Sequence, residues 1–390
     1  MSQTQTQSQN SVPLLDVGRG NAPLREEFLD ALAAVIDSGK FLFGPDVGEL
    51  EREIANYSQA QHAIGCASGS DALLLALMAA DIGPGDEVIV PSFTFFASVS
   101  CITRLGATPV FVDVRRDTFN MDEEKFAEAI TAKTKVVIPV HLFGQCAAID
   151  RICQIASERN ILVVEDAAQA IGAAYNSRPA GSWGSIGCFS FYPTKNLGGM
   201  GDGGMLTTGD AATADKLRLL GSHGMRPRYY HQILGINSRL DTFQAAVLRV
   251  KMKYLAAAVE ARQENAARYE RLFRDAGLLD NGDLTLPFQD ASAFHVWNQY
   301  SLRVGCGKRD SLKASLTERG IGTEIYYPVP MHKQACFSHL AIPSAGLPET
   351  ESACAEVLNL PIYPELTTEE QVRVVDAIRS FYRGSIRAAA

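Results

Sequence analysis

The chain has 390 residues, of which 46% are apolar and 21% charged, as is typical of a globular protein with a large core. Because single hydrophobic cores rarely grow beyond about 250–300 residues, this length predicts two domains, and the composition excludes a mostly disordered chain. The formal net charge is −8 and no block of basic residues stands out, which argues against nucleic acid as a partner.

The N-terminus and the cysteines indicate a cytoplasmic protein. The stretch MSQTQTQSQNS is polar and unlike a secretory signal, so we expect a disordered tail over residues 1–13. The longest strongly apolar run, Ala72–Ala80, is far shorter than the ~20 residues of a membrane-spanning helix, so we expect no membrane partner. The eight cysteines show no CxxC pair and no ligand spacing, which predicts reduced, mostly buried thiols and no metal site.

Strands and helices are predicted to alternate through the first half of the chain. Two helices come first, over Pro23–Ser38 and after Pro45. Runs of β-branched residues then predict strands at Glu87–Val90, Val110–Val114, Val136–Val140 and Ile161–Glu165. Helical stretches between them cover Ala72–Ala80, Phe96–Leu105, Glu123–Ile130 and Ile149–Glu158. Continuously apolar strands that alternate with helices are typical of an α/β domain, with a mainly parallel sheet between helices.

The pattern changes after residue 239. Thr242–Ala276 contains no Gly or Pro and predicts one long helix or two end to end. The segments beyond it predict a strand, a helix, a second strand and a last helix at Tyr300–Val304, Arg309–Arg319, Thr323–Tyr327 and Thr368–Tyr382. This order indicates a smaller α+β domain. We therefore expect the tail over 1–13, a large α/β domain over 14–245 and a small C-terminal domain over 246–390.

An acid and a lysine follow two of the predicted strands. Asp166 ends one strand, and Lys195 comes just after another, Cys188–Tyr192. Ligands of open α/β sheets bind beyond the carboxyl ends of the strands, so both side chains are expected at one crevice. A desolvated lysine can be a neutral amine that forms a Schiff base with an aldehyde. Pyridoxal 5'-phosphate (PLP) needs such a lysine, an acid on its ring nitrogen and donors for its phosphate.

Two glycine-containing stretches bear on phosphate binding. The turn at 67–71 opens an apolar helix, whose free N–H groups can bind a phosphate; an ordinary helix cap is the alternative. The run Gly199–Gly204 formally matches the GxGxxG pattern of NAD-binding proteins. That fingerprint closes an early strand and opens a helix, whereas this run follows a late strand and precedes another. A nicotinamide-dependent oxidoreductase is therefore disfavoured.

The motifs, in this order, resemble those of the DegT/DnrJ/EryC1/StrS family of sugar aminotransferases, a branch of the aspartate-aminotransferase (fold type I) superfamily. The resemblance runs from Leu14 to Tyr382. It is carried by the stretches GPDVGELE, ASGSDAL, PSFTFFAS, GATPVFVDV, VEDAAQA, FSFYPTKNLGGMGDGG, GINSRLDTFQAAVL and EIYYPVPMHKQACF.

The resemblance implies a role for each matching residue. Lys195 would bind PLP covalently and move the proton, while Asp166 would hold the ring nitrogen. The other cofactor residues would be Gly69, Ser70, Phe95, Gln169, Ser190 and Asn237, with Ser70 in place of the family's usual threonine. Asn237 is expected to reach the phosphate of a neighbouring subunit, which implies a homodimer with shared active sites. The substrate-facing residues would be Arg239, Tyr326, Tyr327 and His332, although interface packing explains the tyrosines and the histidine equally well.

The family implies transfer of an amino group from L-glutamate to a keto group of a nucleotide-linked sugar. The substrate-facing segments favour position C3, in amino-sugar and polysaccharide biosynthesis, with UDP and dTDP both open as the nucleotide. Lysine at position 195 argues against the dehydratase branch, which has histidine there. Another PLP reaction and a non-catalytic regulator with this fold remain as alternatives, and a regulator would not need Lys195 and Asp166 together.

Overall fold

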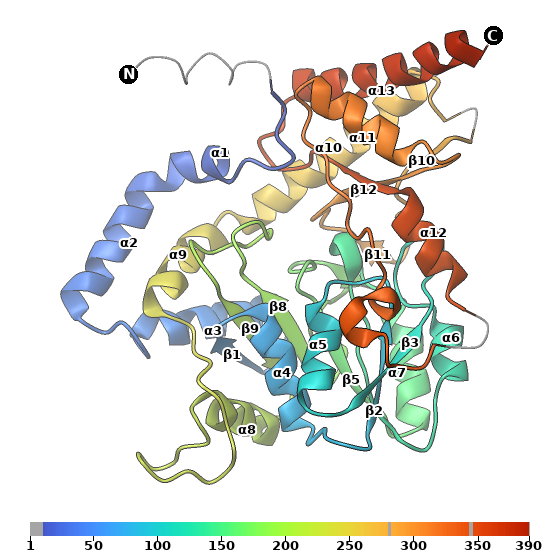
Figure 1. Cartoon of the computed structure of the whole chain (residues 1–390). Helices are drawn as coiled ribbons and strands as arrows, with labels where there is room; N and C mark the ends of the chain where they lie inside the picture. The colour runs from blue at the N-terminus through green and yellow to red at the C-terminus, as the bar shows by residue number, and fades with distance from the viewer. Residues whose placement is uncertain (1–10, 280–281, 343–345, 390) are drawn as a thin grey trace.

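A seven-stranded sheet forms the centre of the large domain (Figure 1). The structure is a computed structural model that describes residues 11–279, 282–342 and 346–389. The strands are β1 (His62–Cys66), β2 (Glu87–Pro91), β3 (Thr108–Val112), β4 (Thr134–Val137), β5 (Leu162–Asp166), β8 (Ile186–Ser190) and β9 (Gly204–Thr208). Their order is β1-β9-β8-β5-β4-β2-β3, and β9 alone among these runs antiparallel to its neighbours. The predicted mainly parallel α/β sheet is therefore confirmed.

Helices cover both faces of this sheet, because its strands are apolar on both sides. On β2, Ile89 packs into one core cluster, whereas Val88 and Val90 pack into the other. The first face is covered by α3 (Pro45–Tyr57), α6 (Glu123–Glu128), α7 (Ile149–Glu158) and α9 (Thr242–Met252). The second face is covered by α4 (Gly69–Ala79), α5 (Ala97–Arg104) and α8 (Ala211–Gly221). This arrangement leaves the carboxyl ends of the parallel strands free to carry a site.

A smaller α+β domain packs at one end of the large domain (Figure 1). Its antiparallel sheet has the order β10 (Leu284–Thr285), β12 (Tyr300–Val304), β13 (Val357–Leu360). Its helices are α10 (Leu255–Asp275), α11 (Arg309–Glu318), α12 (Pro348–Glu356) and α13 (Thr368–Ala389). A third small sheet joins β11 (Ala293–Phe294) to the hairpin of β6 (Ala174–Tyr175) and β7 (Arg178–Pro179). The remaining helices are α2 (Arg25–Ser38) and the short α1 (Val17–Asn21), η2 (Ala22–Leu24), η3 (Leu142–Gly144), η4 (Met331–Lys333) and η5 (Ala335–Phe337).

The structure corrects the expected limits of the tail and of the large domain. Residues 1–10 of the predicted tail lie outside the described residues, but Val12 is fully buried and its backbone pairs with Ile321. The stretch predicted as one or two helices consists of α9 and α10. The first turns of α10 still belong to the core of the large domain, through Leu255 and Val259. Ordered structure therefore begins before residue 14, and the core of the large domain extends past residue 245.

The structure also bears on the strand expected at Thr323–Tyr327 and on the cysteines. The segment predicted as a strand at Thr323–Tyr327 is not one, because it makes only an isolated bridge between Glu324 and Asn359. All eight cysteines are free, and five of them are buried, as expected for most of them. No helix within the described residues combines the length and the apolar character needed to cross a bilayer.

Candidate active site

Lys195 lies in the turn after β8, at the carboxyl edge of the sheet. Its backbone N–H donates to the carbonyl of Tyr192 over 2.9 Å. The turn requires glycine at position 198, because a Cβ there would lie 2.4 Å from the carbonyl oxygen of Pro193. Burial lowers the pKa of Lys195 to about 8, although the negative charge of Asp166 acts in the opposite direction. Near neutral pH the amine can therefore both hold and release a proton.

Asp166 ends β5, the strand that pairs with β8. Its side chain is 5% exposed, so the carboxylate needs hydrogen-bond donors. Ser98, in the first turn of α5, donates to Oδ2 over 2.7 Å, and the backbone N–H of Ala168 donates to Oδ1 over 3.1 Å. The carboxylate is thus held in one orientation, close enough to Lys195 to act on the pKa of its amine.

A cradle of small residues forms where α4 begins beside the end of β8. Ser68 caps α4 by accepting the backbone N–H of Asp71 over 3.1 Å, while the first N–H groups of the helix have no acceptor within it. A Cβ on Gly69 would lie 2.6 Å from Cβ of Ser190, so only glycine fits against this serine. Gly69, Ser70 and Ser190 are therefore brought together, as the sequence predicts.

Aromatic residues border the same site. The ring of Phe95 is 56% exposed, and its centroid lies 6.1 Å from that of Tyr327. Tyr327 also neighbours Gln169, whose Oε1 accepts the backbone N–H of Phe143 over 2.7 Å. Tyr326 packs on Tyr327 at 5.9 Å between ring centroids. The structure therefore brings Phe95, Gln169 and both tyrosines to one place, although they come from both domains.

The segment with Asn237 and Arg239 runs beside the turn at residues 67–71 of its own chain. Between them, the Ser238 hydroxyl accepts the backbone N–H of Ala67 over 3.1 Å. The side chain of Asn237 is exposed, and Arg239 lies over the ring of Phe43 at 5.6 Å. Within one chain, these contacts turn Arg239 toward Phe43 rather than toward the residues around Lys195.

His332 lies apart from this group. Its ring is buried, with Nδ1 2.7 Å from the hydroxyl of Ser92 and Nε2 3.4 Å from Oε1 of Glu351. Both ring nitrogens thus already have partners within the chain. The geometry does not support the expected contact between His332 and a substrate, and packing against Phe111 accounts for its burial.

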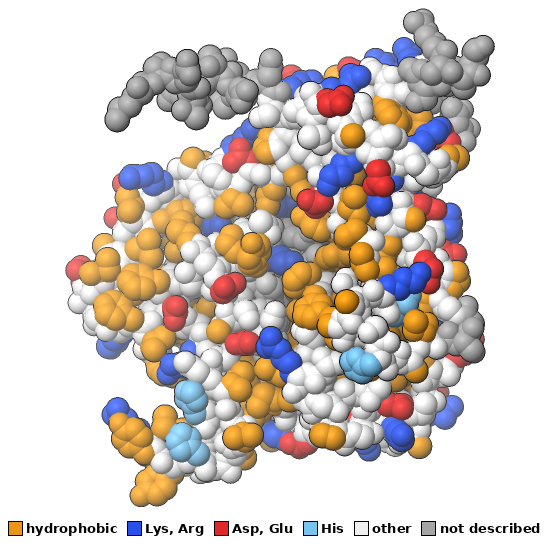
Figure 2. Space-filling view, in the orientation of Figure 1, with side chains coloured by type: hydrophobic (Ala, Val, Ile, Leu, Met, Phe, Trp, Pro, Cys, Tyr) orange, Lys and Arg blue, Asp and Glu red, His pale blue; other side chains and the backbone are white. Residues whose placement is uncertain are grey.

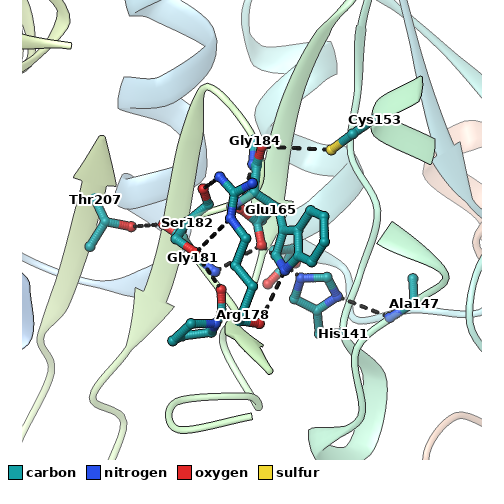
Figure 3. A network of polar contacts seen from close by, with 12 residues as sticks. His141, Ala147, Cys153, Glu165, Arg178, Gly181, Ser182, Gly184 and Thr207 are labelled. Atoms are coloured by element: carbon teal, nitrogen blue, oxygen red, sulfur yellow. Dashed lines mark hydrogen bonds and ion pairs between the residues drawn. The ribbon is translucent and has the colours of Figure 1, made fainter. Parts of the chain in front are cut away.

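The sequence reasoning missed a buried network behind the site (Figure 3). Glu165, which is fully buried, accepts backbone N–H groups from Gly181, Trp183 and Gly184 over 2.7–2.8 Å. Its Oε2 also lies 3.0 Å from Nε2 of His141, whose Nδ1 accepts the N–H of Ala147. Because Nδ1 accepts, Nε2 carries the proton and donates it to Glu165. The available signal was the position of Glu165 directly before Asp166 at a strand end.

The glycine-rich run after Lys195 does not open a helix. Met200 donates its backbone N–H to Oε1 of Gln244 over 2.8 Å, and Gly204 is the first residue of β9. Cβ atoms on Gly199 and Gly201 would lie 2.8 and 2.9 Å from the same glutamine side chain. The run is therefore a turn packed on α9, which agrees with the rejection of a dinucleotide fingerprint.

Together these residues fit PLP. Lys195 offers an amine with a lowered pKa, Asp166 offers a fixed carboxylate, and Gly69 leaves a cradle that any Cβ would fill. Phe95 presents an exposed ring beside them. Within the described residues no group of three or more His, Cys, Asp or Glu side chains could hold a metal ion.

Comparisons with known proteins agree with this assignment. Residues 23–379 match the model of the DegT/DnrJ/EryC1/StrS aminotransferase family. A pleiotropic regulatory protein from Geobacillus stearothermophilus is 48% identical over 96% of this chain and 99% of the relative. A UDP-N-acetyl-3-dehydro-alpha-D-glucosamine 3-aminotransferase from Acidithiobacillus ferrooxidans is 44% identical over the same shares. The crystal structure of S. venezuelae DesV in complex with a ketimine intermediate is 42% identical, with a TM-score of 0.91 over 95% of this chain and 98% of that one. Other solved relatives hold the cofactor in its PLP or PMP form.

Proposed function

Since this chain belongs to the DegT/DnrJ/EryC1/StrS family and is a PLP-dependent aminotransferase, we propose that it aminates a nucleotide-linked ketosugar. The acceptor would carry its keto group at C3, and L-glutamate would supply the amino group. The position is supported by the name of the Acidithiobacillus relative, a 3-aminotransferase of a UDP-linked sugar. UDP and dTDP both remain open as the nucleotide. The observation that carries the proposal is the convergence of Lys195, Asp166 and the Gly69 cradle at one edge of the sheet.

Each residue of this site has a defined task. PLP, when bound, supplies an aldehyde that carries the amino group and a ring that withdraws electrons. Nζ of Lys195 would bind the cofactor and move a proton, which a pKa of about 8 permits near neutral pH. The Asp166 carboxylate would balance positive charge on the ring nitrogen. The start of α4 and Ser190 would hold the phosphate, and the exposed ring of Phe95 would lie against the cofactor ring.

The tyrosines and Arg239 would serve the sugar nucleotide. Tyr326 and Tyr327 place hydroxyl groups and aromatic faces beside Phe95, a combination suited to a sugar. The guanidinium of Arg239 would bind a phosphate or hydroxyl group of the substrate from across a subunit boundary. Since both nitrogens of His332 are engaged elsewhere, it is not included among the substrate ligands.

The active enzyme would be a homodimer with shared sites. Large apolar side chains are exposed near Asn237, among them Phe43, Tyr229, Tyr230 and Leu234. Figure 2 shows hydrophobic side chains on the projection formed by the segment between α8 and α9. Exposed apolar patches of this kind mark interaction sites, and the chemistry fits a second copy of the chain. Asn237 would then reach the phosphate in the partner's site.

The place in the cell is also proposed. Eight free cysteines, five of them buried, fit the reducing conditions of the cytoplasm.

An amino sugar that stays linked to its nucleotide is an activated donor for glycosyl transfer. We therefore place this reaction in the supply of amino sugars for polysaccharide, such as lipopolysaccharide.

The direct test is amination of nucleotide 3-ketosugars by the purified holoenzyme with L-glutamate. Formation of 2-oxoglutarate and of the amino sugar, both lost in Lys195→Ala, is the expected result. Loss of the amine removes general acid–base catalysis worth about 10²–10⁴-fold as well as the covalent link to PLP. Release of 2-oxoglutarate without any aminated sugar would retain the transaminase and reject the sugar acceptor. A purely regulatory protein would show neither product.

A further inference from the structure

We infer that Ser98, backed by Thr94, is a positioning residue that aims the Asp166 carboxylate at the ring nitrogen of the cofactor and favours a proton on that nitrogen. This inference rests on the proposed role of Asp166. It assigns a task to two hydroxyl groups that lie behind the acid rather than against the cofactor.

Ser98 contacts Asp166 directly. Oγ of Ser98 lies 2.7 Å from Oδ2 of the carboxylate, and both side chains are buried. An ionised carboxylate has no proton to give, so the hydroxyl proton of Ser98 must point at the carboxylate. Hydrogen bonds of a hydroxyl to an ionised group are about twice as strong as those between neutral groups.

A second hydrogen bond, from Thr94 to Ser98, extends the contact away from Asp166. Oγ1 of Thr94 lies 2.9 Å from Oγ of Ser98, and Thr94 is buried as well. Since the single proton of Ser98 is used on Asp166, Thr94 must be the donor in this second contact. Both hydrogen bonds therefore point toward Asp166, and a donor that itself receives a hydrogen bond is polarised and donates more strongly.

Thr94, Phe95 and Ser98 lie on one turn at the start of α5. The backbone N–H of Ser98 donates to the carbonyl of Phe95 over 3.2 Å, and Thr94 directly precedes Phe95. One turn at the start of α5 thus carries both the exposed ring and the hydroxyl groups that hold the acid. The N–H of Ala168 holds the other carboxylate oxygen, Oδ1.

The consequence concerns where one proton resides. Between the carboxylate and a pyridine nitrogen, the proton can sit on nitrogen, which gives an ion pair, or on oxygen, which gives a neutral pair. Donors on Asp166 stabilise its charged form, so the chain from Thr94 and Ser98 favours the ion pair. A protonated ring withdraws electrons, whereas a neutral ring does so poorly.

The test is nitrogen NMR of the holoenzyme reconstituted with PLP that carries ¹⁵N in its ring, because protonation moves the ring signal strongly. We expect a protonated ring in the wild type and a displaced, less protonated signal in Ser98→Ala, with kcat about 10- to 100-fold lower and little change in KM. Ser98→Thr should restore both readouts, and Thr94→Val should give a smaller displacement. Ser100→Ala, in the same helix, is the matched control and should leave the signal unchanged.

Asp166→Asn provides the reference for a ring without its acid. A displaced signal in Asp166→Asn together with a wild-type signal in Ser98→Ala would overturn the inference and leave the role of Asp166 intact. A wild-type signal in Asp166→Asn would overturn the role of Asp166 and the inference with it. If Ser98→Ala does not fold, Ser98→Cys decides the question, since it has nearly the same shape and only a weak S–H donor.

Discussion

Glu165 and Asp166 are neighbours on β5, yet their carboxylates serve opposite sides of the sheet. Glu165 is enclosed by three backbone N–H groups and His141, whereas Asp166 is held by Ser98 and one backbone N–H at the candidate active site. Because successive strand residues point to opposite faces, one residue can anchor the strand end while the next serves chemistry. The two carboxylates should therefore respond differently to neutralisation.

Glu165→Gln should lower the stability of the protein. The amide retains one oxygen, and its NH₂ group would face donors such as the N–H of Gly181 and Nε2–H of His141. Buried donors that lose an acceptor predict a loss of about 2–5 kcal/mol in the free energy of unfolding. Urea denaturation of the apoprotein measures it. Glu128→Gln, at an exposed glutamate, is the control, and an equal effect of both changes would contradict the anchoring role.

Asp166→Asn should retain the fold and lose most of the activity. The amide cannot balance a positive ring nitrogen, and loss of one charge-assisted hydrogen bond costs about 1.5–3 kcal/mol, or roughly 10- to 100-fold in rate. The measurement is kcat with L-glutamate and a nucleotide ketosugar. Asp113→Asn is a matched change, because that buried acid accepts the N–H groups of Glu349 and Thr350 in α12 instead. Similar rates in the two variants would count against Asp166.

Lys195 should make the stability of the apoprotein depend on pH. Its pKa is lowered from 10.5 to about 8, so between these values the folded chain binds fewer protons than the unfolded chain. Stability then rises with pH through this window, and the gain is lost as pH falls through 8. The melting temperatures of the wild type and of Lys195→Met are to be measured from pH 7 to 10.5. As the pH rises, the melting temperature of the wild type should increase relative to that of the variant. If the two melting temperatures change in parallel with pH, burial does not lower the pKa of Lys195.

Two inactive chains should together form an active dimer. In a mixed dimer of Lys195→Ala and Asn237→Asp, one site receives both lesions and the other neither, if Asn237 acts across the interface. Aspartate at 237 places a negative charge against the phosphate, which disfavours binding. Mixing the two variants should therefore restore part of the activity. Subunit exchange confirmed by mass, without returning activity, would show that the sites are not shared.

The sequence predicted the local and periodic parts of the molecule well. The apolar strands, α7 and the strand-end positions of Asp166 and Lys195 follow from patterns within a few residues. β1 was missed because its run HAIGC is short and contains glycine, which weakens a strand pattern. The partners of Ser98, Glu165 and His332 were missed because each contact joins segments far apart in the chain. Such contacts are set by packing rather than by local pattern.

The pairing of Val12 with Ile321 has a consequence for how the polypeptide acquires its structure during synthesis. Val12 belongs to the same core cluster as Leu302, Leu358 and Ile378, so the core of the small domain joins residues that lie almost 370 positions apart in the sequence. Translation delivers Val12 first and the remaining members of that core last. The large domain can collapse during synthesis, whereas the core of the small domain can close only after Ile378 has emerged from the ribosome.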